Sequence, residues 1–181
     1  FDSSKDRRDP FEFPLGAGHV IAAIAIGGAP AVARAALLAP ATADVVLVTR
    51  IVRVSDGDTV HAMINGRAVR VRLSAIDAPE AGQAFGEKAR RALADMVTGR
   101  DVELHRVGVD VHQRPLVVLS VEGVSVNAEL VRLGWAWVFR QYSSDVELIA
   151  LEDVARRNRW GLWGDPHPIP PWEFRRNARG R

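Results

Sequence analysis

The chain has 181 residues, a formal net charge of +2 and no cysteine. This length allows one domain with a substantial core, and the absence of cysteine excludes disulfides, a thiolate nucleophile and a Cys-ligated zinc site. An apolar fraction of 48% and a charged fraction of 25% are those of a soluble globular protein. The five histidines lack metal-ligand spacing. The weak positive charge permits an anionic partner such as nucleic acid without requiring one.

Residues 1–43 differ in composition from the rest of the chain. They begin with a charged stretch and continue, over residues 16–43, in an Ala- and Gly-rich apolar run that ends in Ala-Thr-Ala. This order is the layout of an export signal cleaved after Ala43, although Pro30 and Arg34 interrupt the run. We therefore expect an export signal or a membrane anchor, with a linker as the alternative. The expected location is periplasmic, secreted or membrane-anchored, with membrane contact through the apolar run.

From residue 44 onward, apolar and polar residues alternate with period two, which is typical of β-strands. The runs 58–64 and 67–73 are separated by Asn65 and Gly66. An Asn-Gly pair at such a place is the strongest short-range signal of a two-residue hairpin, because both residues must take a positive φ. Three further runs predict strands over residues 44–54, 101–107 and 115–121.

Three helices are predicted by helical spacing and by capping signals. They are expected over Phe85–Met96, from an N-cap at Asn127 to Gly134, and from an N-cap at Ser144 to Gly161. Five strands with one helix between the third and fourth are the order of an OB-type barrel, so the predicted fold class is α+β, a five-stranded OB-type β-barrel with three helices. The expected organisation is a signal-like segment at residues 1–43, a barrel domain at 44–165 and a Pro-rich, basic tail at 166–181.

The hairpin register brings two charged stretches together. If Asn65 and Gly66 form the loop, Thr59 lies opposite Arg72 and Asp58 lies opposite Leu73. The stretch "SDGDT" and the head of "RLSAIDAPE" therefore share one end of the hairpin.

Several oxygen ligands for a metal ion gather at that end. Asp56 and Asp58 are two residues apart, the spacing that places side chains on one side of a strand. Asp77 is a third carboxylate, and the proline after Ala78 restricts that residue to extended conformations, so its carbonyl could face an ion. Oxygen-only ligands suit a hard cation, and a loose mixture of carboxylate, carbonyl and water suits Ca²⁺ better than Mg²⁺.

Three further side chains fit phosphodiester hydrolysis. Arg72 and Arg114 offer planar, permanently charged forks for phosphate, and Glu80 could orient or deprotonate a water. Arg72 and Glu80 are both expected on a solvated site. Each element alone also has an ordinary interpretation, because Asp-Gly is a common turn and alternating arginines are the polar face of a strand. The combination of order, spacing and shared hairpin end favours a phosphodiester-cleaving metal site.

The sequence resembles the staphylococcal nuclease-like (thermonuclease) family over roughly residues 50 to 165. The resemblance is carried by "VSDGDTVHAMINGRAVRVRLSAIDAPE", "FGEKARRAL", "DVHQRPLVVLSVEGVSVNAELVRLGWAWV" and "RNRWGLW". It implies an OB-fold barrel with added helices and Ca²⁺-dependent cleavage of DNA and RNA. The implied products have 3′-phosphate ends.

The resemblance also implies roles for single residues. Asp58, Asp77 and the carbonyl of Ala78 would hold Ca²⁺, with Asp56 and Thr59 beside them. Arg72 and Arg114 would bind the phosphate in the transition state, Glu80 would hold the attacking water, and His112 and Tyr142 would contact substrate. The family's aromatic-Gly-Arg run is replaced here by His112-Gln113-Arg114-Pro115, which removes a residue that takes positive φ easily.

The predicted function is therefore a Ca²⁺-dependent endonuclease that hydrolyses DNA and RNA with little sequence specificity. The first alternative is a catalytically inactive OB-fold module that binds nucleic acid. The second is a structural or surface-anchored protein in which the acidic cluster holds Ca²⁺ for stability. A monomer without a protein partner is expected.

Overall fold

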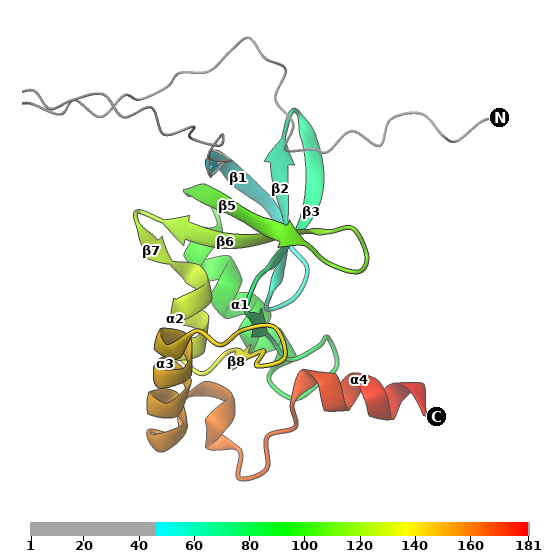
Figure 1. Ribbon diagram of the computed structural model, residues 1–181, viewed down its shortest axis with the longest axis vertical. Coiled ribbons are helices and arrows are strands. Elements are labelled where there is room, and N and C mark those ends of the chain that lie inside the picture. The colour runs from blue at the N-terminus through cyan, green and yellow to red at the C-terminus, as the bar shows by residue number, and fades with distance from the viewer. Residues whose placement is uncertain (1–45, 181) are drawn as a thin grey trace, which may run out of the picture. The chain divides into compact units, whose positions relative to one another are not determined.

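The computed structural model describes residues 46–180, and its centre is a closed β-barrel (Figure 1). Neighbouring strands pair in the order β3-β2-β1-β5-β6, and a parallel pairing of β3 with β6 closes the barrel. The barrel strands are β1 (Val46–Val54), β2 (Thr59–Ile64), β3 (Arg67–Leu73), β5 (Asp101–Val109) and β6 (Pro115–Val121). The expected five-stranded barrel is confirmed.

The helices lie beyond one end of the barrel (Figure 1). A short two-stranded ribbon, β4 paired with β8, lies among them. In Figure 1, β8 lies between α3 and α4. The shorter strands and the helices are β4 (Ile76–Asp77), β7 (Val124–Ser125), β8 (Trp137–Val138), α1 (Gly86–Val97), α2 (Val126–Arg132), α3 (Val146–Arg157), the 3₁₀ helix η1 (Gly161–Gly164) and α4 (Pro171–Arg179).

The core follows from the alternation of apolar side chains along the barrel strands. On β2, Val60, Ala62 and Ile64 are buried, whereas Met63 between them is exposed. A strand with one buried face fixes its own register, because a shift by one residue would turn the whole apolar set toward water. The charged residues at the strand ends are thereby held in fixed positions.

The predicted hairpin is confirmed in its register. Asn65 and Gly66 take φ values of 51° and 73°, and β2 pairs with β3 from Ile64↔Arg67 to Thr59↔Arg72. Beyond the last pair, the Leu73 N–H donates to the carbonyl of Asp58 at 2.8 Å. The two charged stretches therefore do meet at one end of the hairpin.

The N-cap predicted for α2 is wrong. Ser125, not Asn127, caps the helix by accepting a hydrogen bond from the backbone of Ala128. Asn127 is 3% exposed and bridges the helix to the barrel, accepting from the Leu119 N–H and donating to the Ser74 carbonyl, both at 3.0 Å. A buried amide must find partners, and here the barrel supplies them.

The N-cap predicted for α3 is wrong by one residue. Asp145, not Ser144, accepts from the backbone N–H groups of Glu147 and Leu148, at 2.9 and 3.2 Å. A carboxylate also complements the positive end of the helix dipole, which a serine hydroxyl does not.

The C-terminal segment forms a fourth helix, where the sequence predicted three helices followed by a tail. Helix α4 begins at Pro171, whose fixed φ suits the first helical position. Trp172 packs edge-on against Trp137 and parallel to Phe139, with ring centroids 5.6 Å apart in both cases. This packing stabilises a nine-residue helix that is too short to persist alone.

The signal or anchor predicted at residues 1–43 lies outside the described residues. Within residues 46–180, no helix has both the length and the apolar character that a membrane span requires.

Candidate active site

Arg72 joins two buried carboxylates at the barrel end that faces the helices. Asp58, in the β1–β2 loop, is 4% exposed, and Asp77, on β4, is fully buried. The Arg72 guanidinium donates one hydrogen bond to Asp58 and another, of 2.9 Å, to Asp77. Burial by itself lowers the pKa of Arg72, but the two carboxylates outweigh it and the pKa is raised. Arg72 is therefore a permanent counter-ion within the fold.

Arg72 and Glu80 were both expected to be solvated, and this is confirmed for Glu80 only. The Arg72 side chain is 14% exposed, whereas that of Glu80 is 35% exposed. The closed barrel and the β4–β8 ribbon bury the strand end that the alternating pattern assigned to solvent.

The remaining contacts of Asp58 hold the β1–β2 loop against the end of β4. The Thr59 hydroxyl and the Ala78 N–H both donate to its carboxylate at 2.9 Å. Ala78 is 3% exposed, and no donor among residues 46–180 binds its carbonyl oxygen. The predicted ligands Asp58, Asp77 and Ala78 therefore do lie together.

Asp56 lies in a turn rather than on a strand. Its carboxylate accepts from the Asp58 N–H at 3.1 Å, so the two side chains do not simply share one face of a strand, as the spacing predicted. Burial first, and then the charge of Asp58, raise the pKa of Asp56 from 3.8 to about 6. Asp56 thus adds negative charge beside the two buried carboxylates.

Gly57 is required by close packing. A Cβ at this position would lie 2.6 Å from the Cβ of Ala78 and 2.7 Å from the Cβ of Ala89. The Asp-Gly-Asp sequence therefore allows the loop to lie directly against the end of β4 and helix α1.

Arg175, on α4, is a site residue that the sequence analysis missed. It donates to both carboxylate oxygens of Asp77, at 3.1 and 2.7 Å, and to Glu80 at 2.6 Å. These hydrogen bonds, above all those donated to Asp77, raise the pKa of Arg175. The only sequence signal was a basic C-terminus, which does not distinguish Arg175 from its neighbouring arginines.

The charges of the site do not balance. Its four carboxylates outnumber its two guanidiniums by two, and the residues are Asp56, Asp58, Asp77, Glu80, Arg72 and Arg175. Burial raises the pKa of Asp77, although hydrogen bonds from Arg175 act against it. Within residues 46–180, no group of three or more acidic or histidine side chains is placed to hold a metal ion. The excess charge and the oxygen donors nevertheless fit one divalent cation.

Arg114 lies near this cluster but bonds elsewhere. It pairs with Asp110 at 2.6 Å, within the loop that joins β5 to β6. Gln113 takes a φ of 60° there, so this position adopts the left-handed backbone conformation although it is not a glycine. Leu116, two residues after Arg114, pairs with Arg72. The structure therefore brings Arg114 to the same barrel end without direct contact to Asp58 or Asp77.

The two predicted substrate contacts, His112 and Tyr142, are both exposed. His112 is exposed in the β5–β6 loop, with its N–H donating to Asp110. Tyr142 is 69% exposed and packs edge-on against Phe139, at 4.8 Å between centroids.

Comparison with known proteins identifies the family. The family model described as staphylococcal nuclease homologue matches residues 70–165. The chain belongs to the staphylococcal nuclease family. It is accordingly a nuclease, an enzyme that hydrolyses phosphodiester bonds.

Similar curated proteins cover most of the chain. The micrococcal nuclease of Shigella flexneri is 38% identical over a 167-residue alignment, and the match covers 81% of this chain and 96% of that protein. An uncharacterised endonuclease of Haemophilus influenzae is 40% identical over 131 residues, 72% of this chain and 74% of its own length. Protein ParB of Escherichia coli is 44% identical over a 142-residue alignment, and the match covers 72% of this chain and 80% of that protein.

The family match does not extend to helix α4. The matched region ends at residue 165, whereas Arg175 lies ten residues further along. Gln83 strengthens the link by accepting from the Glu80 N–H and donating to the Ile169 carbonyl, at 3.0 and 2.6 Å. In this nuclease the C-terminal helix is therefore joined directly to the carboxylates.

Gly57→Ala should destabilise the nuclease by about 1–3 kcal/mol, because the new methyl group overpacks the contact with Ala78 and Ala89. The measurement is the free energy of unfolding in urea. Gly108→Ala is the matched control, since its Cβ would meet nothing closer than 4.0 Å. Equal stability of the two variants would contradict the close packing at Gly57.

Asp56 should make the stability of the metal-free nuclease depend on pH. Its pKa is about 6 in the folded protein and ordinarily 3.8, so the folded state binds the proton more tightly. The free energy of unfolding should fall as pH rises from about 4 to 6. Asp56→Asn should remove this fall, matching the wild type below pH 4 and exceeding it above pH 6. Unfolding in chelator across this range provides the test, and parallel curves for the two proteins would contradict it.

Proposed function

We propose that the protein is a Ca²⁺-dependent endonuclease that hydrolyses DNA and RNA with little sequence specificity and leaves 3′-phosphate ends. The observation that carries the proposal is the buried pair Asp58 and Asp77, bridged by Arg72 and next to Glu80. A purely binding OB module has no need of two desolvated carboxylates, which are costly to bury.

The oxygens of Asp58 and Asp77 and the carbonyl of Ala78 fit a hard cation. The carboxylates are held in place by the barrel, the site carries excess negative charge, and no described donor binds the carbonyl. Oxygen ligands of mixed type suit Ca²⁺. When bound there, the cation would polarise a phosphate oxygen and favour attack on phosphorus.

Arg72 and Arg114 would hold the phosphate. Both guanidiniums are paired with aspartates through single hydrogen bonds, and a phosphate would offer each a bidentate partner. Charge that develops on the equatorial oxygens during in-line attack would then be stabilised by fixed donors. The aspartates keep the two arginines ordered before the substrate binds.

Glu80 would hold the attacking water. Its side chain is 35% exposed, unlike those of Asp58 and Asp77, so water reaches it. Its backbone N–H is fixed by Gln83. A carboxylate in this position can orient a water and accept its proton. Cleavage of the bond between phosphorus and the 5′ oxygen would leave the phosphate on the 3′ side.

Arg72→Lys and Glu80→Gln should each lower the rate of single-stranded DNA cleavage by roughly 10²- to 10⁴-fold. Lysine keeps the charge and fills most of the buried volume but loses the planar fork. The assay is digestion by the full chain with Ca²⁺, with Mg²⁺ and with chelator, followed by analysis of the product ends. Cleavage by the wild type should require Ca²⁺.

Arg70→Ala is the matched control, because Arg70 is exposed on the same strand. Activity of Arg72→Lys equal to that of this control would remove Arg72 from the mechanism. Binding of DNA by the wild type without cleavage in any metal would favour the alternative, an inactive OB-fold nucleic-acid-binding module.

Arg175→Gln should bind Ca²⁺ more tightly than the wild type, by about tenfold or more, because the cation no longer has to displace a guanidinium from Asp77. Isothermal titration calorimetry measures this affinity without substrate. Arg179→Gln, at the exposed end of the same helix, controls for the loss of one positive charge. A weaker affinity in Arg175→Gln would instead make Arg175 a support for the cation site.

A further inference from the structure

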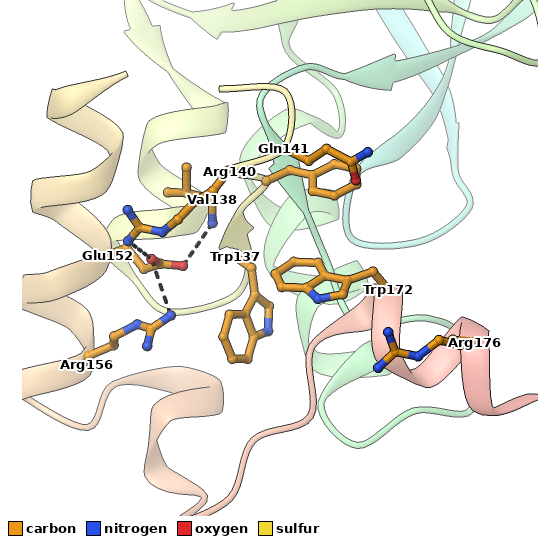
Figure 2. Close-up of a pocket in the computed structure, with 9 residues that line it drawn as sticks. Trp137, Val138, Arg140, Gln141, Glu152, Arg156, Trp172 and Arg176 are labelled. Atoms are coloured by element: carbon orange, nitrogen blue, oxygen red, sulfur yellow. Dashed lines mark hydrogen bonds and ion pairs between the residues drawn. The ribbon is translucent and has the colours of Figure 1, made fainter. Parts of the chain in front are cut away.

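A cavity of about 540 Å³ opens next to the carboxylates, between β8, α3 and α4 (Figure 2). It is lined mainly by aromatic rings and guanidiniums. The residues that matter here are Trp137, Phe139, Arg140, Arg156, Trp172 and Arg176. Nothing in the mechanism proposed above uses this cavity.

The cavity carries net positive charge. Arg140 and Arg156 share the fully buried Glu152, at 2.7 and 3.4 Å, as the dashed lines in Figure 2 show. The side chain of Arg176 forms no ion pair or hydrogen bond within the described part of the chain. One buried carboxylate therefore faces three arginines, and the excess of positive charge suits an anion such as phosphate.

The cavity also offers aromatic surfaces. Phe139 and Trp172 lie nearly parallel, with an angle of 5° and centroids 5.6 Å apart. Arg156 is held over Trp137, with its guanidinium carbon 5.0 Å from the ring centroid. Bases stack on such rings whatever their identity, and arginines beside the rings follow the phosphates. This combination is typical of a groove for single-stranded nucleic acid.

The cavity is adjacent to the proposed reaction centre. Trp137, in the cavity wall, pairs across the β4–β8 ribbon with Asp77. On α4, Trp172 contacts Trp137, while Arg175, three residues later, binds Asp77. Residues three apart lie on the same side of a helix. A strand whose scissile phosphate lies at Asp77 therefore passes the cavity with a neighbouring nucleotide.

We propose that this cavity is a subsite for a nucleotide flanking the scissile bond, with its phosphate at Arg176 and its base against the Phe139–Trp172 pair. The inference rests on the proposed function, since it takes single-stranded nucleic acid as the substrate. Arg140 and Arg156 also have a structural role as partners of Glu152. Arg176 has no such role, which makes it the residue that tests the subsite.

The experiment measures binding of a fluorescent single-stranded DNA oligonucleotide to the full chain by anisotropy, in chelator, at several salt concentrations. Arg176→Ala should bind more weakly than the wild type. The slope of log K against log salt should become shallower by about 0.7, the value expected for one lost phosphate contact on a single strand. Arg176→Lys should keep the wild-type slope. Arg179→Ala is the matched control on the same helix and should also keep it.

Thermal unfolding of Arg176→Ala should match that of the wild type, because the side chain has no hydrogen-bond or ion-pair partner to lose within residues 46–180. A wild-type slope in Arg176→Ala, or no binding by the wild type at low salt, would overturn the subsite. Cleavage is measured separately on the wild type with Ca²⁺. A shallower slope without wild-type cleavage would refute the proposed nuclease mechanism while leaving the subsite in place.

Discussion

The structure of this site depends on one mostly buried guanidinium between two buried carboxylates. Asp58 and Asp77 would repel each other and lose hydration without a cation between them, and Arg72 supplies it from the neighbouring strand. Removing one partner of such a group costs several kcal/mol, because the others stay buried and unpaired. In the proposed mechanism, the same three side chains that order the barrel end form the centre at which a metal ion and a phosphate would compete for partners.

Helix α4 adds a second cation to this centre from outside the matched family region. Trp172 anchors the helix on Trp137, and Arg175 then reaches Asp77 and Glu80. Packing and charge act together, because the aromatic contact fixes the helix and the fixed helix presents the arginine. In this chain helix α4 therefore both contacts the carboxylates and lines the neighbouring cavity.

Predictions that depended on interactions between neighbours in the sequence were correct, whereas predictions that depended on contacts between distant segments were less reliable. The Asn65–Gly66 hairpin was predictable to the residue, because turn chemistry and the alternating pattern are local. The caps at Asn127 and Ser144 were not. Asn127 is instead recruited to bridge the helix to the barrel, and Asp145, next to Ser144, makes the stronger cap. A residue's local capping preference is overridden where burial of its side chain requires other hydrogen bonds, or where a neighbouring residue interacts better with the helix dipole.

The sequence by itself determined the barrel, the shared hairpin end and the set of residues Asp58, Arg72 and Asp77, because periodicity, an Asn-Gly turn and family motifs are all readable along the chain. Only the tertiary structure decided that the Arg72 side chain is as little as 14% exposed and that Arg114 pairs with Asp110. It alone placed Arg175 on a carboxylate 98 residues earlier in the chain. The sequence does not distinguish an exposed arginine from one that binds a carboxylate of the site. The distinction depends on which strand the helix that carries the arginine packs against.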